Sequence, residues 1–284
     1  MPDIVDLTNA PPTTPPAHQV QQRLFAGDIL IFRNQPAIHA LVAQADRMIR
    51  DAFPETAPQT ITQAVARDPF VRRAAELRRA YGEDDQVLEG WRRALGACGL
   101  NLSRTYWDQT RLRINTPGDS HHSRRIRNLP AHRDSWGSML PQQINWWAPI
   151  YPVQAGNSLL IYPDAWDRMV DNDSATWDLQ ELQRLRAQGD VGDYPLLPNA
   201  LNPAQWGEPV ALLPKPGDIV AFSAAHLHAS AINQTGQSRY NIEGRTLDAD
   251  AFEAGDGAPD ADAQAPHVAY HWFTHCVTGD TLAP

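Results

Sequence analysis

Cysteine is almost absent from this chain. Cys98 and Cys276 are the only two among 284 residues, which is too few for a disulfide scaffold or a cage of cysteine metal ligands. No apolar run approaches the roughly 20 residues that a bilayer span requires. The first residues, Met-Pro-Asp-Ile-Val-Asp, lack the basic-then-apolar order of a secretory signal. These absences predict a cytoplasmic protein that folds around an ordinary hydrophobic core.

Positive charge is also scarce. Lys and Arg number 24 against 33 Asp and Glu, which leaves a formal net charge of −9. Such an excess disfavours nonspecific binding to nucleic acid or to an anionic membrane surface. We therefore expect a small-molecule partner, with no nucleic acid and no membrane. The sequence indicates no oligomeric state.

The charge is unevenly distributed along the chain. Residues 101–150 carry seven arginines and three aspartates, whereas residues 248–263 carry six acidic residues and no basic one. A locally basic segment in an acidic protein attracts small anions, most strongly at low salt. The distribution therefore favours an anionic small molecule, although a solvated arginine-rich loop would give the same count.

Several catalytic motifs are missing as well. The sequence has no Gly-rich phosphate loop, no Gly-x-Ser-x-Gly elbow and no His-Glu-x-x-His pair. Their absence argues against the nucleotide, serine-hydrolase and zinc-protease chemistries that depend on them. A catalytic site has to be sought in other polar clusters.

The order of periodicities predicts the fold class. Residues 1–20 are proline-rich and expected to be extended, and residues 36–98 show the three- and four-residue apolar steps of buried helical faces. Residues 102–247 carry short apolar runs separated by Gly, Pro, Asn and Asp, and residues 248–284 form an acidic C-terminal segment. This order predicts an α+β fold with a mainly β core and helices packed outside an antiparallel sandwich or barrel. No linker is apparent, so residues 1–284 are predicted to form a single domain.

Individual elements follow from the same patterns. Helices are expected from Pro36, at about 69–81 and at about 85–97, with a helical insertion at about 175–188. The predicted strands are residues 27–32, 111–115, 143–147, 158–162, 209–213, 219–223 and 239–247.

Two histidine clusters stand out among the polar residues. One contains His132 and Asp134 in the tripeptide His-Arg-Asp, and the other is His226-Leu227-His228. In an extended segment, side chains two apart point the same way, so His132 and Asp134 can converge. A histidine from the second cluster would complete a 2-His-1-carboxylate triad, which leaves one face of Fe(II) open for a bidentate cosubstrate and O2. The tripeptide alone is equally compatible with an N-cap aspartate beside an exposed histidine.

The residues around the second cluster favour the metal-binding interpretation. A Pro-Gly-Asp turn at 216–218 is followed by an apolar strand, and Arg239 lies eleven residues past His228. An arginine on the neighbouring antiparallel strand suits the distal carboxylate of 2-oxoglutarate, because guanidinium is always charged and binds carboxylate through two hydrogen bonds. A surface arginine paired with a carboxylate is the alternative.

Together these motifs resemble the Fe(II)/2-oxoglutarate-dependent oxygenases of the phytanoyl-CoA-hydroxylase-like type. The resemblance covers about residues 111–247 and rests on His132-x-Asp134, on Gly-Asn-Ser-Leu-Leu-Ile-Tyr-Pro at 156–163, and on the Pro-Gly-Asp turn that leads to His228. It implies a double-stranded β-helix, a cupin-like jelly roll with the metal at one open end. The implied activity is hydroxylation of an unactivated C–H bond of a small, polar or anionic molecule, such as an amino acid or a natural-product intermediate, with release of succinate and CO2.

The resemblance also implies a metal site and its cosubstrates. His132, Asp134 and His228 would be the catalytic metal ligands, with His226 as the alternative distal ligand. Fe(II), 2-oxoglutarate and O2 are the implied cofactors, with ascorbate as a reductant. Related halogenases have Ala or Gly in place of the aspartate, so Asp134 favours hydroxylation.

Further residues are assigned to the cosubstrate and the substrate. Arg239 is the expected anchor of 2-oxoglutarate, with Arg245 in reserve on the same strand. Asn115 is expected to contact 2-oxoglutarate because a polar side chain inside a jelly roll needs a partner. The candidate substrate contacts are Arg113, Asn145, Trp147 and Trp136. A tryptophan in such a position is also compatible with core packing.

Two alternatives remain open. The same oxidant could carry out desaturation or cyclisation. The chain could also be a non-oxygenase metal-binding protein, either a cupin-like isomerase or a ligand-binding module. Arg239 discriminates between these classes, because a noncatalytic module has no need of an oxoacid anchor.

Overall fold

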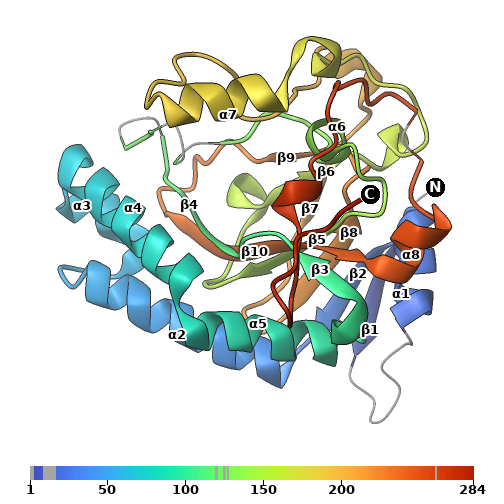
Figure 1. Cartoon of the computed structure of the whole chain (residues 1–284). Helices are drawn as coiled ribbons and strands as arrows, with labels where there is room; N and C mark the ends of the chain where they lie inside the picture. Colours follow the sequence, from blue (N-terminus) through green and yellow to red (C-terminus); the bar gives the residue numbers. More distant parts are fainter. Residues whose placement is uncertain (1–2, 9–16, 119–120, 124–125, 127, 260) are drawn as a thin grey trace.

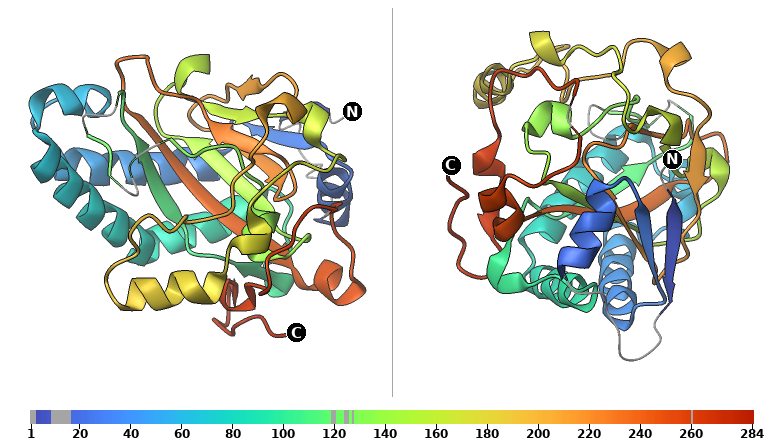
Figure 2. Two further views of the ribbon diagram at one scale, coloured as in Figure 1. Left: turned by 90° about the horizontal axis from the view of Figure 1, so that it is seen from above. Right: turned by 90° about the vertical axis from the view of Figure 1, so that its right-hand side faces the viewer.

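The computed structural model describes residues 3–8, 17–118, 121–123, 126, 128–259 and 261–284. A layer of helices packs against one face of a large sheet, and a small sheet packs against the other face (Figures 1 and 2). The proline-rich run at 9–16 and three arginines of the basic segment, Arg124, Arg125 and Arg127, lie outside the described residues.

The N-terminal segment is only partly extended. Strand β1 (Ile4–Thr8) pairs in parallel with β2 (Ile29–Arg33), and helix α1 (Ala17–Phe25) lies between them in the sequence. The prediction that residues 1–20 are extended is therefore wrong from Ala17 onward. The helix forms because it buries Val20 and Leu24 in the core.

Three long helices form the layer over the large sheet: α2 (Pro36–Ala52), α4 (Arg67–Glu83) and α5 (Asp85–Ala97). Short helical turns at Pro58–Thr60 and Ile61–Ala64 (α3) connect α2 to α4. The apolar steps after Pro36 correctly predict the buried face of α2, which consists of Ile38, Leu41, Val42, Ala45 and Ile49.

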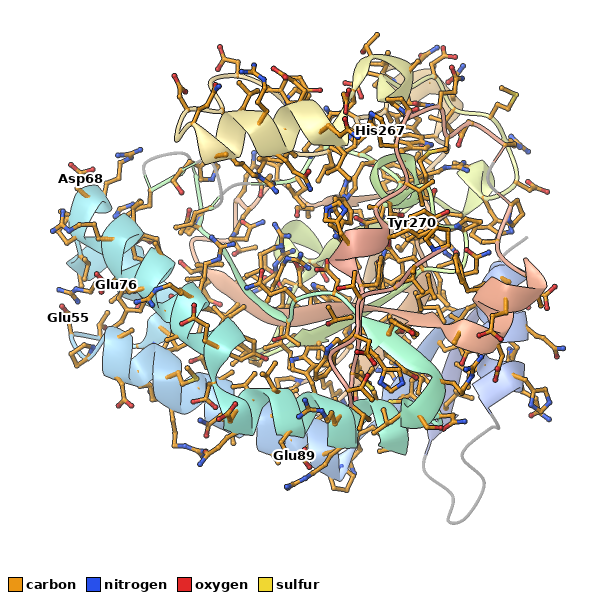
Figure 3. The ribbon with its side chains drawn as sticks, viewed as in Figure 1. Glu55, Asp68, Glu76, Glu89, His267 and Tyr270 are labelled. Carbon is orange, nitrogen blue, oxygen red and sulfur yellow. The ribbon has the colours of Figure 1, made fainter. Side chains whose placement is uncertain are left out.

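The outer faces of these helices carry charged side chains. Glu76 on α4 and Glu89 on α5 project away from the sheet (Figure 3). The Asp84 carboxylate caps α5 by accepting a hydrogen bond from the Val87 N–H at 2.9 Å, as expected of an acidic residue at a helix N-terminus.

Most strands belong to the large sheet, whose order is β1-β2-β8-β5-β10-β3-β11, with β4 also paired to β10. Apart from β1 and β2, its described neighbours are antiparallel. Its other strands are β3 (Thr105–Trp107), β4 (Arg111–Asn115), β5 (Ile144–Pro149), β8 (Ile219–Ser223), β10 (Arg239–Asp248) and β11 (Thr274–His275).

The small sheet has the order β7-β6-β9. Its strands are β6 (Leu159–Ile161), β7 (Val210–Leu212) and β9 (His228–Ser230). Ile161 and Leu212 pack against Ile31, Trp147 and Phe222 of the large sheet. This apolar contact holds the two sheets face to face, so that β9 lies opposite the middle of the large sheet.

The α+β class is confirmed, and all seven predicted strands occur with small shifts of their ends. The helical insertion is α7 (Leu179–Ala187), and the acidic segment contains α8 (Ala249–Ala254). Four strands were not predicted: β1, β3, β9 and β11. Three of these have two or three residues, which is too short to show a periodicity. Within the described residues, no helix has both the length and the apolar character needed to cross a membrane.

Asp218 fixes the turn that leads into β8. Its carboxylate accepts hydrogen bonds from the N–H groups of Lys215 and Asn34, at 2.8 and 2.9 Å, and from Arg33 at 2.7 Å. Burial by itself raises the pKa of this carboxyl, but the two backbone N–H groups and Arg33 outweigh burial and hold the pKa below its usual range. The carboxylate thereby ties the end of β2 to the start of β8.

Replacing this carboxylate tests its contribution to stability. Asp218→Ala is expected to lower the free energy of unfolding by about 1–3 kcal/mol at neutral pH, since buried N–H groups lose their acceptor. A depressed folded-state pKa stabilises the fold above the ordinary aspartate pKa of about 3.9 and ceases to do so as the pH falls through the folded value. Chemical denaturation at neutral and acidic pH should therefore show the two proteins converging in acid. An equal loss in Asp51→Ala, at an exposed position on α2, would contradict this account.

Candidate metal centre

The two histidines of the candidate triad are brought together by backbone pairing. His132 and His228 form an isolated antiparallel bridge, in which each N–H donates to the other residue's carbonyl oxygen at 2.9 and 3.0 Å. Their ring centroids are 4.1 Å apart. Because β9 is also paired with β6, the position of the His228 ring is fixed by the small sheet.

Asp134 reaches the same point from a helical rather than an extended backbone. It has helical backbone angles (φ −67°, ψ −28°) and directly precedes the short helix α6 (Ser135–Ser138). The expectation of a uniformly extended His-x-Asp segment is therefore wrong, although its two side chains do converge. The N-cap alternative is not realised either, because the Asp134 side chain makes no capping hydrogen bond.

The ligand atoms of His132, Asp134 and His228 all lie within 4.8 Å of one another, and all three residues are buried. The His228 Nε2 is 3.6 Å from the Asp134 Oδ2. Two imidazoles and one carboxylate at such separations are a ligand set that divalent transition metals accept, and three coordination positions would stay open on one face.

The hydrogen bonds of the histidines define which nitrogen can bind a metal. His132 Nδ1 lies 2.8 Å from the Pro130 carbonyl oxygen, and His228 Nδ1 lies 3.0 Å from that of His226. A carbonyl oxygen only accepts, so each Nδ1 carries the hydrogen and each Nε2 keeps its lone pair for the centre of the triad. Backbone carbonyls commonly orient metal-binding histidines in this way.

Burial and charge keep both imidazoles neutral and the carboxyl ionised. Burial, followed by the neighbouring His228, lowers the pKa of His132 to about 3. Burial likewise lowers the pKa of His228. For Asp134 burial by itself raises the pKa, but Arg245 and the two histidines outweigh burial and hold it well below its usual range. These are the protonation states that metal binding requires.

Both oxygens of Asp134 are held by side chains from the large sheet. Arg245 on β10 donates to Oδ1 at 2.6 Å, and Asn145 on β5 donates to Oδ2 at 2.7 Å. Asn145 is in turn oriented by Gln143, whose Nε2 donates to it at 2.9 Å. Asn145, predicted as a substrate contact, is therefore a partner of the candidate ligand Asp134.

His226, the alternative distal ligand, points away from the triad. Its Nε2 lies 2.8 Å from the Gly27 carbonyl oxygen, and its ring packs on Trp166 with centroids 4.2 Å apart. Although His226 and His228 are two residues apart, His226 precedes β9 in a turn. The two side chains therefore do not share a face.

Arg239 lies at the first position of β10, with 3% of its surface exposed. It lines the same small cavity as His132, Asp134 and His228. Its NH1 group donates to the Asn157 carbonyl oxygen at 3.0 Å, its Nε has no hydrogen-bond partner, and no carboxylate of the described part of the chain forms an ion pair with it. Burial, followed by Arg113, lowers its pKa to about 10, so the group is a buried cation at neutral pH.

Two other cosubstrate candidates are engaged elsewhere. Arg245, the reserve anchor, binds Asp134 and also Asp108, at 3.2 Å. Asn115 does not line the cavity of the triad, and its amide donates to the Asn128 side chain at 2.8 Å. The geometry therefore leaves Arg239 as the candidate anchor.

Of the remaining residues predicted to contact the substrate, two line the small cavity and one does not. Trp147 lines the small cavity, where the Arg239 guanidinium lies 5.9 Å from its ring centroid. Arg113 lines it too, but donates through two nitrogens to Glu243. Trp136 is wrong as a substrate contact, because it is fully buried in another cluster and its indole N–H donates to Asp262 at 2.7 Å.

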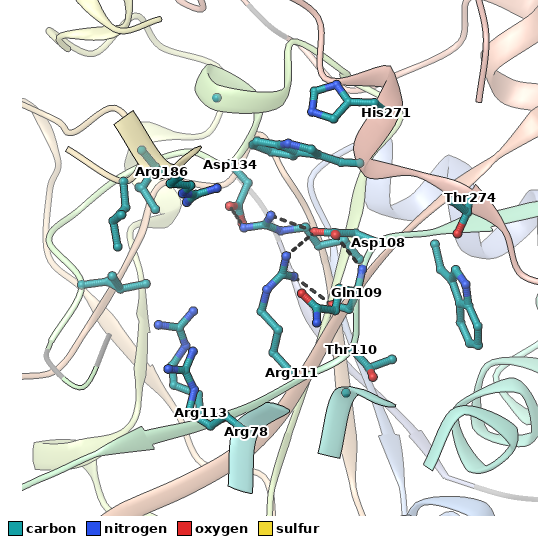
Figure 4. A pocket seen from close by; sticks show the side chains of 18 of the residues that line it. Arg78, Asp108, Gln109, Thr110, Arg111, Arg113, Asp134, Arg186, His271 and Thr274 are labelled. Carbon is teal, nitrogen blue, oxygen red and sulfur yellow. Dashed lines mark hydrogen bonds and ion pairs between the residues drawn. The ribbon is translucent and has the colours of Figure 1, made fainter. Parts of the chain in front are cut away.

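A second, wider cavity of about 550 Å³ adjoins the triad (Figure 4). It shares Asp134, Arg111, Arg113, Arg245 and Leu129 with the small cavity. Its other lining was not predicted from the sequence and includes Arg78, Asp108, Arg186, His271 and Trp272. No local motif marks these residues, since they come from α4, the segment before β4, α7 and the C-terminal segment.

Comparisons with known proteins yield only distant structural similarities. No family model matches the chain, and no curated protein matches its sequence. The similar solved structures include the epimerase SnoN in complex with Fe3+, alpha-ketoglutarate and nogalamycin RO (16% identity, 88% of this chain and 96% of that chain, TM-score 0.44). Others are EvdO2 from Micromonospora carbonacea var. aurantiaca with 2-oxoglutarate (14%, 87% and 94%, 0.44) and apo EctD from S. alaskensis (16%, 84% and 79%, 0.40).

These TM-scores are low, so the family likeness has to be judged on the chain's own residues. The motif on which the sequence resemblance rests, His132-x-Asp134 with a distal histidine, is present and its three side chains are assembled at one point. By this triad the chain is similar to the phytanoyl-CoA-hydroxylase-like Fe(II)/2-oxoglutarate-dependent oxygenases.

Proposed function

We propose that this protein is an Fe(II)- and 2-oxoglutarate-dependent oxygenase that hydroxylates a small molecule. The observation that carries the proposal is the pairing of the assembled triad with a buried arginine in one cavity. The fold proposed with it is the double-stranded β-helix, whose two faces would be the facing sheets, in a single domain that includes the helical layer.

The donor set fits Fe(II). His132 and His228 would bind through Nε2, because their Nδ1 hydrogens are committed to backbone carbonyl oxygens. Asp134 would supply the third ligand, with its carboxylate oriented by Arg245 and Asn145. Bound iron and 2-oxoglutarate together supply the oxidation of an unactivated C–H bond by O2, in which 2-oxoglutarate leaves as succinate and CO2.

Arg239 fits the distal carboxylate of 2-oxoglutarate. A buried guanidinium without a paired carboxylate is costly, and a dicarboxylate that reaches from the triad would supply the missing charge. Its unbonded Nε would gain an acceptor, and Trp147 would exclude water from the ion pair. A metal-binding module without oxygenase activity has no need of this cation, which is why we prefer the oxygenase.

Hydroxylation is the proposed outcome because Asp134 occupies the third ligand position, which a halogenase would leave to chloride. Desaturation and cyclisation use the same oxidant and differ only in the fate of the substrate. Product analysis under isotopically labelled O2 distinguishes them, since hydroxylation alone adds a labelled oxygen atom to the product.

The ligand assignment can be tested with three alanine variants. His132→Ala and His228→Ala are each expected to abolish iron binding and succinate formation, because each removes one of three ligands. His226→Ala should retain iron while losing stability, about 1–3 kcal/mol for the vacated buried carbonyl. Iron content after dialysis and circular dichroism provide the two readouts. Iron retained by His228→Ala but lost by His226→Ala would show that the distal ligand is wrong.

The cosubstrate anchor can be tested by comparing two oxoacids. Arg239→Gln should weaken 2-oxoglutarate binding to the iron-loaded protein by about tenfold to a hundredfold, the range for a charged hydrogen bond. Binding of 2-oxobutyrate, which lacks the distal carboxylate, should be unchanged. Anaerobic calorimetry gives both affinities, and Arg239→Lys provides the matched control that keeps the charge. If the iron-loaded wild type binds no 2-oxoglutarate and forms no succinate with a broad substrate panel, the oxygenase proposal fails.

Arg245 should set the affinity for iron through Asp134. Arg245→Gln is expected to weaken iron binding by about 10- to 100-fold, the usual effect of losing a residue that orients a metal ligand. Arg111→Gln is the matched control, because Arg111 also binds Asp108 but, within the described part of the chain, forms no ion pair with Asp134. Titration with Fe(II) under anaerobic conditions measures both. Equal losses in the two variants would assign the effect to Asp108 rather than to the ligand.

A further inference from the structure

Residues 269–276 of the C-terminal segment form part of the wall of the wider cavity. They run from α6, which adjoins the triad, to β3 in the large sheet (Figure 1). At one end the Ala269 N–H donates to the Ser138 carbonyl oxygen at 2.9 Å. At the other end the Cys276 N–H donates to the Thr105 carbonyl oxygen at 3.0 Å. The stretch is therefore fixed at both ends, and the side chains that it presents to the cavity are preorganised.

Trp272 contributes an indole ring to this wall, close to the triad. The residue is half-buried and lies in the short turn Tyr270–Trp272. The Arg245 guanidinium lies 5.7 Å from the Trp272 ring centroid. The same guanidinium donates to the Asp134 Oδ1 at 2.6 Å. One side chain thus connects the indole to a candidate metal ligand, so a molecule packed against Trp272 lies beside the metal centre.

Other apolar side chains add to the surface that Trp272 begins. Trp107 on β3 lines the same cavity, and it pairs with Thr274, two residues after Trp272. The Arg92 guanidinium lies over the Trp107 ring, 4.9 Å from its centroid. The apolar lining also includes Leu88, Leu196 and Leu197. An apolar surface with two indole rings suits a flat ring system, because aromatic rings pack favourably on one another.

The charged side chains next to the triad form a network of ion pairs. The network consists of three arginines and three carboxylates: Arg111, Arg113, Arg245, Asp108, Asp134 and Glu243. Each of these arginines binds at least one of the carboxylates, at distances between 2.6 and 3.2 Å. The charges of the network balance, so it gives no preference for a ligand of either sign. Ring packing is then the interaction that selects a ligand in this part of the cavity.

We propose that the wider cavity binds a substrate with an aromatic ring system and that Trp272 selects this substrate by packing against its ring. This inference rests on the proposed function, because it identifies the substrate class of the oxygenase. The indole holds the ring beside Arg245 and Asp134, so that a C–H bond on or next to the ring faces the metal centre. The cavity volume of about 550 Å³ lies within the range of small-molecule sites.

Two probes with the same carbon skeleton test the requirement for an aromatic ring. Both are uncharged alcohols, but 2-naphthol is flat and aromatic, whereas decahydro-2-naphthol is saturated and puckered. Their binding to the metal-free full-length protein is measured by calorimetry. The protein should bind 2-naphthol about three- to tenfold more tightly, the range that an aromatic pair adds to apolar burial. Equal affinities, or binding of neither alcohol, would overturn the proposal.

Substitutions in the turn Tyr270–Trp272 test the location of the ring. Trp272→Leu keeps apolar bulk but removes the indole, and it should abolish the preference for 2-naphthol over the saturated alcohol. Trp272→Phe keeps a ring and should retain most of that preference. Tyr270→Leu is the matched control, because the Tyr270 ring packs on Phe252, with centroids 6.0 Å apart, and is not among the described residues that line the cavity. A preference that survives Trp272→Leu, or is lost equally in Tyr270→Leu, would contradict the assignment.

Two further outcomes separate this inference from the oxygenase proposal. Trp147 also offers an indole ring, in the small cavity beside Arg239. If Trp147→Leu abolishes the preference for 2-naphthol and Trp272→Leu does not, the ring occupies the cosubstrate pocket and the inference fails. Because the assay contains no metal, a preference that depends on Trp272 supports the ring-binding site even if the iron-loaded protein fails to bind 2-oxoglutarate. In that case the oxygenase proposal alone is lost.

Discussion

The backbone bridge between His132 and His228 is the interaction on which the candidate site depends. Two reciprocal N–H to carbonyl hydrogen bonds join a loop to the small sheet and bring the two rings to 4.1 Å. The carbonyl oxygens of Pro130 and His226 accept the two Nδ1 hydrogens. The lone pairs of the two Nε2 atoms are therefore left for the centre of the triad. Main-chain geometry therefore positions the two histidines of the candidate site, whereas the third residue, Asp134, is held by the side chains of Arg245 and Asn145.

Strand β10 supplies the charges that surround the triad. Arg239, Glu243 and Arg245 all lie on it, and their alternation places them on one face of the strand. Arg245 compensates Asp134 and Glu243 compensates Arg113, whereas Arg239 is left without a carboxylate among the described residues. Buried charge in this protein is therefore paired where it orients a ligand and unpaired where we propose that a dicarboxylate binds.

The helical layer and the helical insertion α7 contribute to the wider cavity, whereas the sheets hold the candidate triad. The sheets hold the triad and Arg239, whereas α4, α7 and the C-terminal segment line the wider cavity with arginine, leucine and tryptophan. Within the basic segment, Arg104 binds Asp250 and Glu253 of the acidic segment, whereas Arg111 and Arg113 line both cavities next to the triad. The other arginines of the small cavity, Arg239 and Arg245, lie on β10 and are far from this segment in the sequence.

The sequence by itself determined the α+β class, the long helices and the strands of five or more residues that follow α5, because their periodicities are local properties of the chain. It also singled out His132 with Asp134, the pair His226 and His228, and Arg239, since each stands in a short recognisable stretch of sequence. The tertiary structure alone decided between His226 and His228, because that choice depends on where the turn before β9 ends. Only the tertiary structure shows that Arg245 binds Asp134 and that Trp136 is buried outside the candidate site. Only the tertiary structure shows that arginines from separate elements line the wider cavity. These outcomes depend on contacts between residues far apart in sequence, which no local pattern encodes.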